Sequence, residues 1–507
     1  MNTETNVTWK KEFTETIDQR DCELPPAWIP TGRLRDSHSE RGYAIHVSGK
    51  ARAMADAVVA LLERAREKSI VSSFLLADTA IQDAMLRAAA RGVRVYVLLA
   101  SEARLGREQG DGEFDKLVLE QHKAMLTKLG GHVLFRSAPH FHAKVVVTDP
   151  DTQPAGILLT ANLTTEALER NEELAVMLNA DEVTELTAYL KWGMWESAEH
   201  ELLDPKDRFK AAHPLGKVPH PTACSAIVAT TAQATSIRDE LVRLIDEARS
   251  QIIVSSFGWD KEHDIVQRLC ARACAGLKLI VLARVRPASM PALLALAEAG
   301  ASVLAFKWLH AKAVWTDRGE ALVMSANLQH DGLDHGFELG VRLSGSRAQE
   351  LRERLAGWRD AAPWKLMARP LLGDLSGTVQ LWHGGKLREE EIQTSMDVAL
   401  DTVIARSANL LEAQRPPLPG NGELPRLAHT LRCTWSVAAP VLAPKAKERR
   451  RPTEGDGKPL PYAPPVFQEP GGRIVVAVKS PDEMESARAV AAEVGASSIV
   501  FAEGGPR

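Results

Sequence analysis

The hydrophobic and polar positions of this chain follow two alternating patterns. In LLERAREK from Leu61 and LIDEARSQ from Leu244, apolar residues recur every three or four positions, and both segments lead into the same stretch, IVSSF. The first spacing is typical of an amphipathic helix, and the short apolar stretch is typical of a buried strand. In each copy a second helix and then a second strand are expected to follow, starting from Ile81 in the first and from Asp264 in the second. This alternation predicts an α/β layered structure.

The same patterns reveal an internal repeat. Each copy continues to a polar cluster, HAKVVVTD from His142 in the first and HAKAVWTD from His310 in the second. The Asn of TANL or SANL follows that His after 20 residues in the first copy and 17 in the second, and a Glu follows the Asn after 11 residues in both. The unequal His-to-Asn separation predicts a β-hairpin whose turn is longer in the first copy.

Changes in composition and in the repeat pattern divide the chain into six segments. They are an N-terminal segment at 1–42, the two copies at 43–205 and 223–365, a mixed segment at 366–443, a linker rich in proline and charge at 444–470, and a small strand, helix and strand unit at 471–507.

The composition is that of an ordinary folded protein. Of the 507 residues, 45% are hydrophobic and 25% are charged, which provides for several compact cores. The formal net charge is −4. Proteins that coat nucleic acid usually carry an excess of Lys and Arg, because these side chains displace counterions from the phosphates. The negative net charge therefore counts against a protein that coats nucleic acid. Any phosphate-binding site must be a local basic cleft.

The N-terminal sequence and the cysteines bear on the compartment. MNTETNVTWKKEFTETIDQRD lacks the apolar core of a secretory signal, and no stretch approaches the roughly 18 apolar residues of a membrane span. The five cysteines match no disulfide framework and no zinc site. These features predict a cytoplasmic protein without a membrane anchor.

The residues of the repeated cluster suit attack on a phosphodiester. In HAK the His and the Lys lie two apart on an expected strand, so both side chains point to the same face. Two Lys ammonium groups can neutralise a phosphate, and two Asn amides can donate to its oxygens. One imidazole can attack phosphorus while the other protonates the leaving alkoxide. This division of work needs both copies.

The pattern H-x-K-x4-D followed by S/T-x-N, present twice, resembles the signature of the phospholipase D superfamily. The resemblance covers residues 43–365 and includes the downstream Asn and Glu. It implies an α/β fold of two tandem phospholipase D-like α/β/α sandwich repeats that form a pseudo-dimer, with a C-terminal extension. Two motifs of the family meet at one active site, so here that site is expected within a single chain.

The resemblance also implies a role for each residue. One His forms a phosphohistidine, and the other acts first as acid and then as base. By analogy with members whose first motif supplies the nucleophile, His142 is the expected nucleophile and His310 the acid. The Glu carboxylates are expected to fix the His tautomers, the Asp residues to support the hairpins, and the hydroxyl residues to donate to the phosphate or brace the loop. The expected catalytic residues are His142, Lys144, Asn162, Glu173, His310, Lys312, Asn327 and Glu338, and the supporting ones are Asp149, Asp317, Thr160 and Ser325.

No metal and no other cofactor is expected, since the lysines do the work of a cation. Three further residues lie close to the motifs. Trp259 and Trp308 could stack on a base, although packing in the core is the favoured interpretation. For His140 a surface position is favoured over one in the pocket.

The substrate stays open between nucleic acid and lipid. Lipid-active members commonly carry an Arg-Ser pair after the Asn, whereas this chain has LTTEALERNEEL and LQHDGLDHGFEL. These segments resemble the corresponding segments of nucleases found beside helicases and in bacterial phage-defence operons. We therefore favour a metal-independent nuclease, with DNA as the preferred substrate and an operon protein such as a helicase as partner. A lipid phospholipase D or phosphatidyl-transferase is the alternative, and a non-catalytic nucleic-acid-binding scaffold is the second alternative.

Overall fold

The chain forms two compact units in a computed structural model. The structure describes residues 8–16, 25–33, 40–101, 105, 112–202, 209–222, 224–370, 377–392, 466–468, 474–478, 488 and 498–503. Residues 31–366 form one unit, which we call the repeat unit. The terminal unit consists of residues 1–30 and 367–507.

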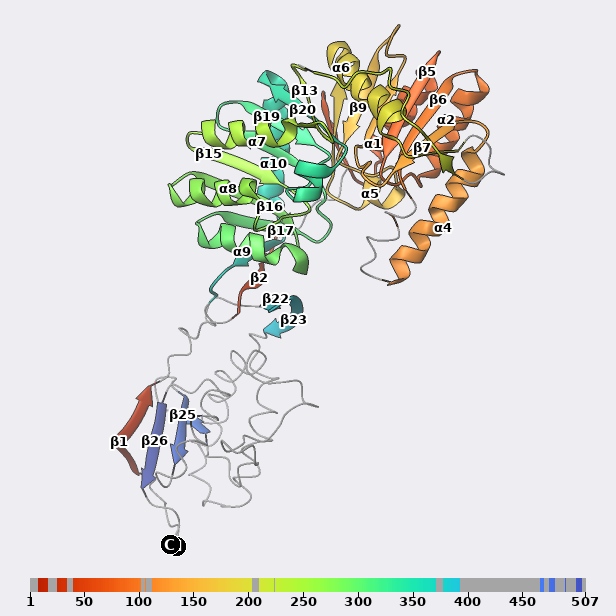
Figure 1. The fold of residues 1–507 in the computed structure, drawn as a ribbon. Helices are drawn as coiled ribbons and strands as arrows, with labels where there is room; N and C mark the ends of the chain where they lie inside the picture. The colour runs from red at the N-terminus through yellow and green to blue at the C-terminus, as the bar shows by residue number, and fades with distance from the viewer. Residues whose placement is uncertain are drawn as a thin grey trace. The chain divides into compact units, whose positions relative to one another are not determined.

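The first repeat is built on a ten-stranded mixed sheet, coloured orange to yellow in Figure 1, with the order β12-β11-β7-β6-β5-β8-β9-β10-β4-β3. Strands β5, β6 and β7 are parallel, and β8 and β9 form the expected hairpin. The strands are β3 (Glu40–Arg41), β4 (Ile45–Val47), β5 (Lys68–Ser73), β6 (Arg94–Ala100), β7 (Leu134–Ala138), β8 (Val145–Thr148), β9 (Ala155–Leu159), β10 (Leu174–Leu178), β11 (His200–Leu202) and β12 (Lys210–Ala211).

Helices cover both faces of this sheet. The apolar sides of α1, α2 and α4 pack with Val71 and Val97 on one face, and α6 lies on the other. Helix α2 begins at Asp78, α5 at Thr164 and α6 at the capping box of Asn179 and Glu182, whose side chains accept backbone N–H groups. The helices are α1 (Ala53–Arg64), α2 (Thr79–Ala90), α4 (Gly112–Leu129), α5 (Thr165–Glu169), α6 (Ala180–Trp192) and the π-helix η1 (Gly193–Ser197).

The second repeat has the same topology, which confirms the expected pair of α/β/α repeats. Its order β13-β20-β19-β18-β15-β16-β17-β21 corresponds strand by strand to β4-β10-β9-β8-β5-β6-β7-β11 of the first. Its elements are β13 (Ile227–Thr231), β14 (Ala234–Thr235), α7 (Ser236–Glu247), β15 (Gln251–Ser255), α8 (Asp264–Cys274), β16 (Lys278–Arg284), η2 (Pro287–Ser289), α9 (Met290–Glu298), β17 (Ser302–Phe306), β18 (Ala313–Thr316), β19 (Glu320–Met324), η3 (Asp331–His335), β20 (Glu338–Ser344), α10 (Gly345–Ala361) and β21 (Trp364–Met367).

The two repeats share one hydrophobic core. It contains Leu186 of α6 and Leu351 of α10 together with inward-facing residues of both sheets. Helix α6 contacts β9 and β13, and α10 contacts β4 and the strands of its own sheet, so each helix touches both repeats. Phe337 is fully buried in this core, where its ring stacks on Trp192 at 6.3 Å. The close approach requires glycine at 193, because a Cβ there would lie 2.7 Å from the Phe337 ring.

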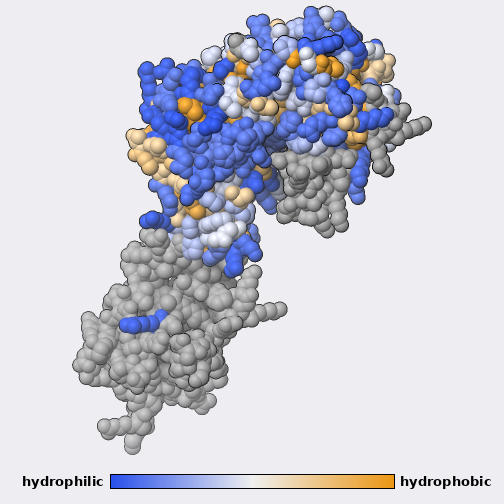
Figure 2. Space-filling view, viewed as in Figure 1, coloured by the Kyte–Doolittle hydropathy of each residue, from blue (hydrophilic) through white to orange (hydrophobic). Residues whose placement is uncertain are grey.

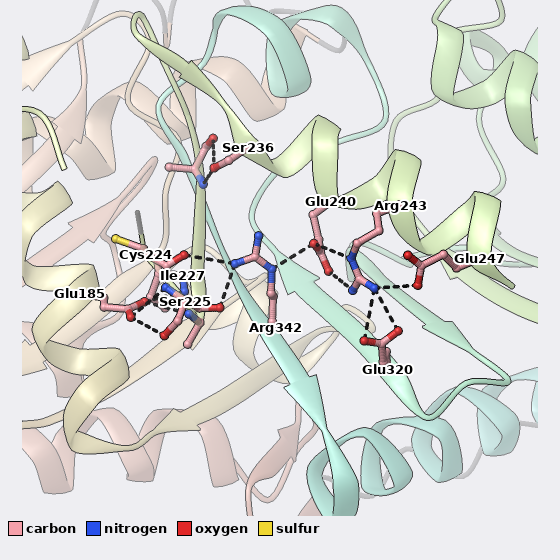
Figure 3. Close-up of polar contacts among 12 residues, drawn as sticks. Glu185, Cys224, Ser225, Ile227, Ser236, Glu240, Arg243, Glu247, Glu320 and Arg342 are labelled. Carbon is pink, nitrogen blue, oxygen red and sulfur yellow. Dashed lines mark hydrogen bonds and ion pairs between the residues drawn. The ribbon is translucent and has the colours of Figure 1, made fainter. Parts of the chain in front are cut away.

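A polar network also fastens the second repeat to α6, as Figure 3 shows. The carboxylate of Glu185 accepts the backbone N–H groups of Ser225, Ala226 and Ile227, each at 2.9 Å, where β13 begins. Burial raises the pKa of Glu185, but a hydrogen bond from the Ser225 hydroxyl at 2.7 Å and these backbone bonds lower it by more. Arg342 of β20 donates to the Ser225 carbonyl at 2.9 Å. The start of the second repeat is therefore held by both repeats.

The terminal unit joins the two ends of the chain. Strand β1 (Thr8–Thr16) pairs antiparallel with β26 (Ser498–Glu503), in the order β1-β26-β25-β24. The other strands are β2 (Ala27–Pro30), β22 (Gly377–His383), β23 (Lys386–Ile392), β24 (Val466–Gln468) and β25 (Ile474–Val478). The helix expected within 471–507 lies outside the described residues except for Arg488.

Among the residues that the structure describes, no helix combines the length and the apolar character needed to cross a membrane. The face of the repeat unit seen in Figure 2 is largely hydrophilic, with small separate hydrophobic areas.

The shared core predicts that Phe337 is essential to stability. We expect Phe337→Ala to lower the free energy of unfolding by about 3–5 kcal/mol, because it leaves a cavity where the repeats meet. Urea denaturation followed by circular dichroism measures this. The matched control is Leu215→Ala, since Leu215 is 51% exposed, and it should change stability by less than about 0.5 kcal/mol. A loss below about 1 kcal/mol for Phe337→Ala would contradict the shared core.

Candidate active site

Two short backbone bridges between the repeats position the motif histidines. Phe141 pairs in parallel with Phe337, and Leu309 pairs in the same way with Glu172. The N–H of His142 donates to the Phe337 carbonyl at 3.2 Å, and the N–H of His310 donates to the Glu172 carbonyl at 3.0 Å. Each bridge therefore sets the His of one repeat beside the residue that precedes the Glu of the other.

The histidines and glutamates consequently pair across the repeats. His142 Nδ1 lies 2.7 Å from Glu338 Oε1, and His310 Nδ1 lies 2.7 Å from Glu173 Oε1. The second oxygen of each carboxylate is bound within its own repeat, where the Thr160 hydroxyl donates to Glu173 at 2.6 Å and the Ser325 hydroxyl donates to Glu338. The two hydroxyl residues thus brace the glutamates.

The two lysines are completely buried. Lys312 Nζ donates to the His310 carbonyl at 2.6 Å and lies 2.9 and 3.0 Å from the ring nitrogens of that residue, while Lys144 Nζ donates to the His142 carbonyl. The sequence prediction that His and Lys lie on a strand is wrong in detail. Strands β8 and β18 begin one residue after the Lys, because the residues before them pair with the other repeat instead.

Both motifs open onto one pocket of about 590 Å³. Its lining includes His142, His310, Asn162, Asn327 and Phe257. The side-chain Oδ1 atoms of both Asn residues are buried without a hydrogen-bond partner. Both side chains line the pocket, where their amide NH2 groups can donate to a bound anion. The structure thus brings His, Lys, Asn and Glu of both repeats together around a single cavity.

Comparison with known proteins agrees with this geometry. A family model described as "Cardiolipin synthase, PLD-like domain" matches residues 58–195 and 241–358, which together make up half of the chain. The chain belongs to the phospholipase D superfamily. It is accordingly an enzyme of the phosphodiester-processing type. No curated protein matches the sequence significantly.

Several solved structures are similar at low sequence identity. Polyphosphate kinase from Porphyromonas gingivalis is 16% identical over 62% of this chain, with a TM-score of 0.41, and the match spans only 50% of that kinase. Phosphatidylserine synthase from Haemophilus influenzae Rd KW20 is 12% identical, with 68% of this chain and 90% of that one covered and a TM-score of 0.49. The phospholipase D family member Nuc from Salmonella typhimurium is 18% identical, with 27% and 96% covered and a TM-score of 0.25.

Burial and the lysines set the protonation of this phospholipase D-type site. Burial lowers the pKa of His142, and Lys144 and Lys312 add to the effect against the opposing charge of Glu338. The same causes lower the pKa of His310 to about 4, with Glu173 opposing. Burial also lowers the pKa of Lys312 to about 7. Both imidazoles are therefore neutral at neutral pH.

The glutamates stay ionised despite their burial. Burial raises the pKa of Glu173, but His310, Lys312 and Thr160 lower it by more. The pKa of Glu338 is lowered in the same way by His142, Lys144 and Ser325. Two carboxylates thus face the two lysines, and this pairing makes the buried charges tolerable.

The remaining sequence-predicted residues lie outside the pocket or at its edge. Asp149 accepts the backbone N–H groups of residues 66–68, and Asp317 accepts those of Arg249 and Ser250, so both fasten the start of a neighbouring strand. Trp259 is buried, with its Nε1 donating to the Ser256 carbonyl at 2.9 Å. His140 lines the pocket and lies 2.8 Å from the Ser197 hydroxyl.

Cationic and aromatic side chains gather on one side of the pocket, and we call this group the basic lip. The guanidinium of Arg284 lies 4.8 Å from the Trp308 ring and 5.3 Å from the Phe257 ring. Arg286 lies 4.3 Å from Phe257, and Arg170 of the first repeat lies 4.1 Å from Trp308. Phe257 and Arg286 also line the pocket. Burial, together with the charges of Arg286 and Arg170, lowers the pKa of Arg284 to about 10.

Sequence reasoning missed the arginines of the basic lip. Arg284 ends the apolar strand β16, and Arg286 follows it in VLARVR. The carboxyl ends of parallel strands are common ligand positions, so this placement could have identified them. Arg170 carries no such signal, because it reaches Trp308 only through the contact between the repeats.

The lowered pKa of His310 predicts that folding is sensitive to acid. Its pKa is about 4 in the folded chain against an ordinary value of 6.5. Between these values the unfolded chain binds the extra proton, so stability falls as the pH is lowered. For this group alone the loss between pH 8 and pH 5 is about 2 kcal/mol. We expect His310→Gln to flatten the pH dependence of the free energy of unfolding by about this amount, as measured by urea denaturation.

His132→Gln is the control, because His132 is exposed and lies outside the site. It should lose as much stability in acid as the unmodified chain. Equal acid losses in the unmodified chain and in His310→Gln would show that His310 is not held neutral by its surroundings.

Proposed function

We propose that this enzyme is a metal-independent nuclease, with DNA as its preferred substrate, that acts through a phosphohistidine. The basic lip is the observation that carries the proposal. Burial lowers the pKa of Arg284, and the charges of the neighbouring Arg286 and Arg170 lower it further. An anion beyond the reacting phosphate would stabilise such a group of arginines. Nucleic acid supplies a row of such anions on either side of the bond that is cut.

The aromatic members of the basic lip fit the same substrate. Phe257 and Trp308 present ring faces between the guanidinium groups. Single-stranded nucleic acid is commonly bound by cations that follow the backbone and by aromatic rings on which bases stack. A lipid with a single phosphodiester needs no cations beyond the pocket itself. We therefore infer that the strand runs from the pocket across the basic lip.

The chemistry follows from the arrangement of the two imidazoles. A nitrogen of neutral His142 attacks phosphorus, and the bond from phosphorus to the leaving oxygen breaks as His310 protonates that oxygen. Glu338 accepts a hydrogen bond from the Nδ1–H of His142 and stabilises the positive charge that forms on the imidazole. Water then attacks the phosphohistidine, gives its proton to His310 and releases His142. Lys144 and the two Asn amides bind the phosphate oxygens throughout, and Lys312 does so while it carries its proton.

The surroundings of His310 favour its role as the acid. Lys312 lies 3.0 Å from the Nε2 atom of His310 and has a pKa lowered to about 7, so it can pass its proton to the imidazole. A bound phosphodiester brings a negative charge close to both groups and raises the pKa of each. His310 is then protonated when substrate is present, while His142 keeps its lone pair for attack.

A lipid phosphatidyl-transferase is the competing candidate, because the matching family model carries the name cardiolipin synthase. The sequence after each Asn, which resembles nucleases of phage-defence operons, favours the nuclease. It also suggests a role in destroying phage DNA in the cytoplasm, together with a partner such as a helicase.

We expect nucleic acid to be hydrolysed and phosphatidyl lipids to be left intact. The test incubates the chain, with EDTA present, with labelled single-stranded DNA, duplex DNA, RNA and phosphatidyl lipids in parallel. His142→Ala and His310→Ala should each lower turnover of the preferred substrate by at least about 100-fold. Acid-free mass spectrometry of a quenched reaction should find phosphate on His142.

Folded His132→Ala serves as the control and should keep full turnover. Faster turnover of lipid than of any nucleic acid would overturn the proposed substrate. Near-normal turnover in either active-site variant would overturn the shared mechanism.

We further expect Arg170→Ala to weaken binding of a single-stranded oligonucleotide and to reduce the slope of log affinity against log salt by about 0.7. Arg170 extends the basic lip away from the pocket, so its loss removes one phosphate contact. Fluorescence anisotropy at several salt concentrations measures both quantities. Arg268→Ala removes the same charge from the outer helix α8, where Arg268 pairs with Asp246 at 2.9 Å, and should change neither. An unchanged slope for Arg170→Ala would show that the basic lip does not take part in binding nucleic acid.

A further inference from the structure

The two repeats meet at the pocket in corresponding positions, so the surroundings of His142 and His310 can be compared directly. The repeated stretch IVSSF ends beside each histidine. The ring of Phe74 lies 5.3 Å from that of His142, and the ring of Phe257 lies 4.9 Å from that of His310. Both phenylalanines line the pocket. We call the surroundings of Phe74 the His142 side of the pocket and those of Phe257 the His310 side.

The two sides differ in charge. Among the described residues, the only cation over the Phe74 ring is Lys144, whose Nζ lies 6.0 Å from the ring centroid. The Phe257 ring has the guanidinium groups of Arg284 at 5.3 Å and Arg286 at 4.3 Å besides the motif lysine of its own repeat. The basic lip therefore belongs to the His310 side.

The corresponding positions of the first repeat carry no lysine and no arginine. Strands β6 and β16 have the same register against β5 and β15, and the motif His and Glu of each repeat give further reference points. Counted in this way, Ala100 corresponds to Arg284, Pro139 to Lys307, His140 to Trp308 and His335 to Arg170. Lys307 lies 5.4 Å from the Trp308 ring and adds a further cation to the His310 side. The first repeat folds without these cations, so the repeat fold itself does not require them.

The His142 side is lined by other polar groups. His140 lies 2.8 Å from the Ser197 hydroxyl, and burial lowers its pKa, so that its imidazole is neutral at neutral pH. The helix η3, whose ends Asp331 and His335 line the pocket, leads into Phe337, and the N–H of Phe337 donates to the His140 carbonyl at 2.9 Å. A neutral imidazole and a carboxylate attract a polyanion less than arginines do.

The proposed chemistry decides which product lies on which side. In an in-line displacement the attacking and leaving atoms lie on opposite sides of phosphorus. When His142 attacks, the bond to the leaving oxygen breaks on the far side, where His310 gives that oxygen its proton. The fragment that departs ends in a hydroxyl and extends over the His310 side. The other fragment stays joined to His142 through the phosphate until water releases it.

We propose that the basic lip binds the leaving fragment, which is the product that ends in a hydroxyl, and that the fragment which keeps the phosphate is bound only at the pocket. This inference rests on the proposed nuclease function, with His142 as nucleophile. The preferred substrate has several phosphates on the leaving side of the bond that is cut and needs none on the other side. Arg170, Arg284 and Arg286 thus determine the direction in which the strand lies across the pocket.

The test uses short single-stranded DNAs in which one natural phosphodiester is flanked by modified linkages. Methylphosphonates carry no charge, whereas phosphorothioates keep the charge and are cut slowly. One oligonucleotide has phosphorothioates on both sides, and two others have methylphosphonates on one side or on the other. Mass spectrometry of the products identifies the fragment that ends in a hydroxyl and the fragment that keeps the phosphate. The kcat/KM of each oligonucleotide is measured at about 50 mM salt, where phosphate contacts contribute strongly.

Neutral linkages on the hydroxyl side should lower kcat/KM by at least about tenfold relative to the fully charged oligonucleotide, because they remove phosphate contacts with the basic lip. Neutral linkages on the phosphate side should lower it by less than about threefold. In Arg170→Ala the first effect should shrink by about twofold or more, since one contact is already lost. Arg268→Ala, on the outer helix α8, should show the full effect.

His335→Arg provides the converse test. It places an arginine on the His142 side at the exposed position that corresponds to Arg170. Neutral linkages on the phosphate side should then lower kcat/KM by about twofold more than in the unmodified chain.

Equal effects of neutral linkages on the two sides, or a larger effect on the phosphate side, would overturn this inference and leave the nuclease function standing. Failure to cut even unmodified DNA would overturn the proposed nuclease function and this inference with it.

Discussion

The exchange of backbone bridges between the two repeats is the constraint on which the rest of this structure depends. Phe141 pairs with Phe337, and Leu309 pairs with Glu172. Through these contacts each histidine receives its carboxylate from the other repeat, and both motifs open onto one pocket. The shared core of α6 and α10 and the network around Glu185 hold the bridges in register.

The electrostatics of the site follow from this pairing of each histidine with a carboxylate of the other repeat. Two lysines and two glutamates are removed from water, and neither repeat alone would place a carboxylate beside its own imidazole. Unpaired, such buried charges would be strongly destabilising. Crossed pairing helps to keep the carboxylates ionised, while burial and the lysines keep the imidazoles neutral against the pull of those carboxylates. A phosphodiester then enters a site whose donors are already fixed, which is the condition for effective transition-state stabilisation.

Most of the fold and the members of the site could be predicted from the sequence, because both follow from local repetition. IVSSF and HAK recur with the same downstream Asn and Glu, so the two α/β repeats and the composition of the site could be predicted. Contacts between distant segments could not be predicted in this way. Three such contacts form only where the folded repeats or loops touch. They are the pairing of Glu173 and Glu338 with the histidines of the other repeat, the stacking of Arg170 on Trp308, and the ring contact of His263 with His330. The pairing of β1 with β26 could not be predicted from the sequence for the same reason.

The crossed carboxylates also impose an order on biosynthesis. His142 is separated by 196 residues from the Glu338 that orients it. At ribosomal rates of about 5–20 residues per second, the first motif exists for roughly 10–40 s before its partner is made. During that interval the nascent chain carries His142 without the carboxylate that orients it. A phosphodiester-processing site assembled in this way stays incomplete on the ribosome until the second repeat has folded.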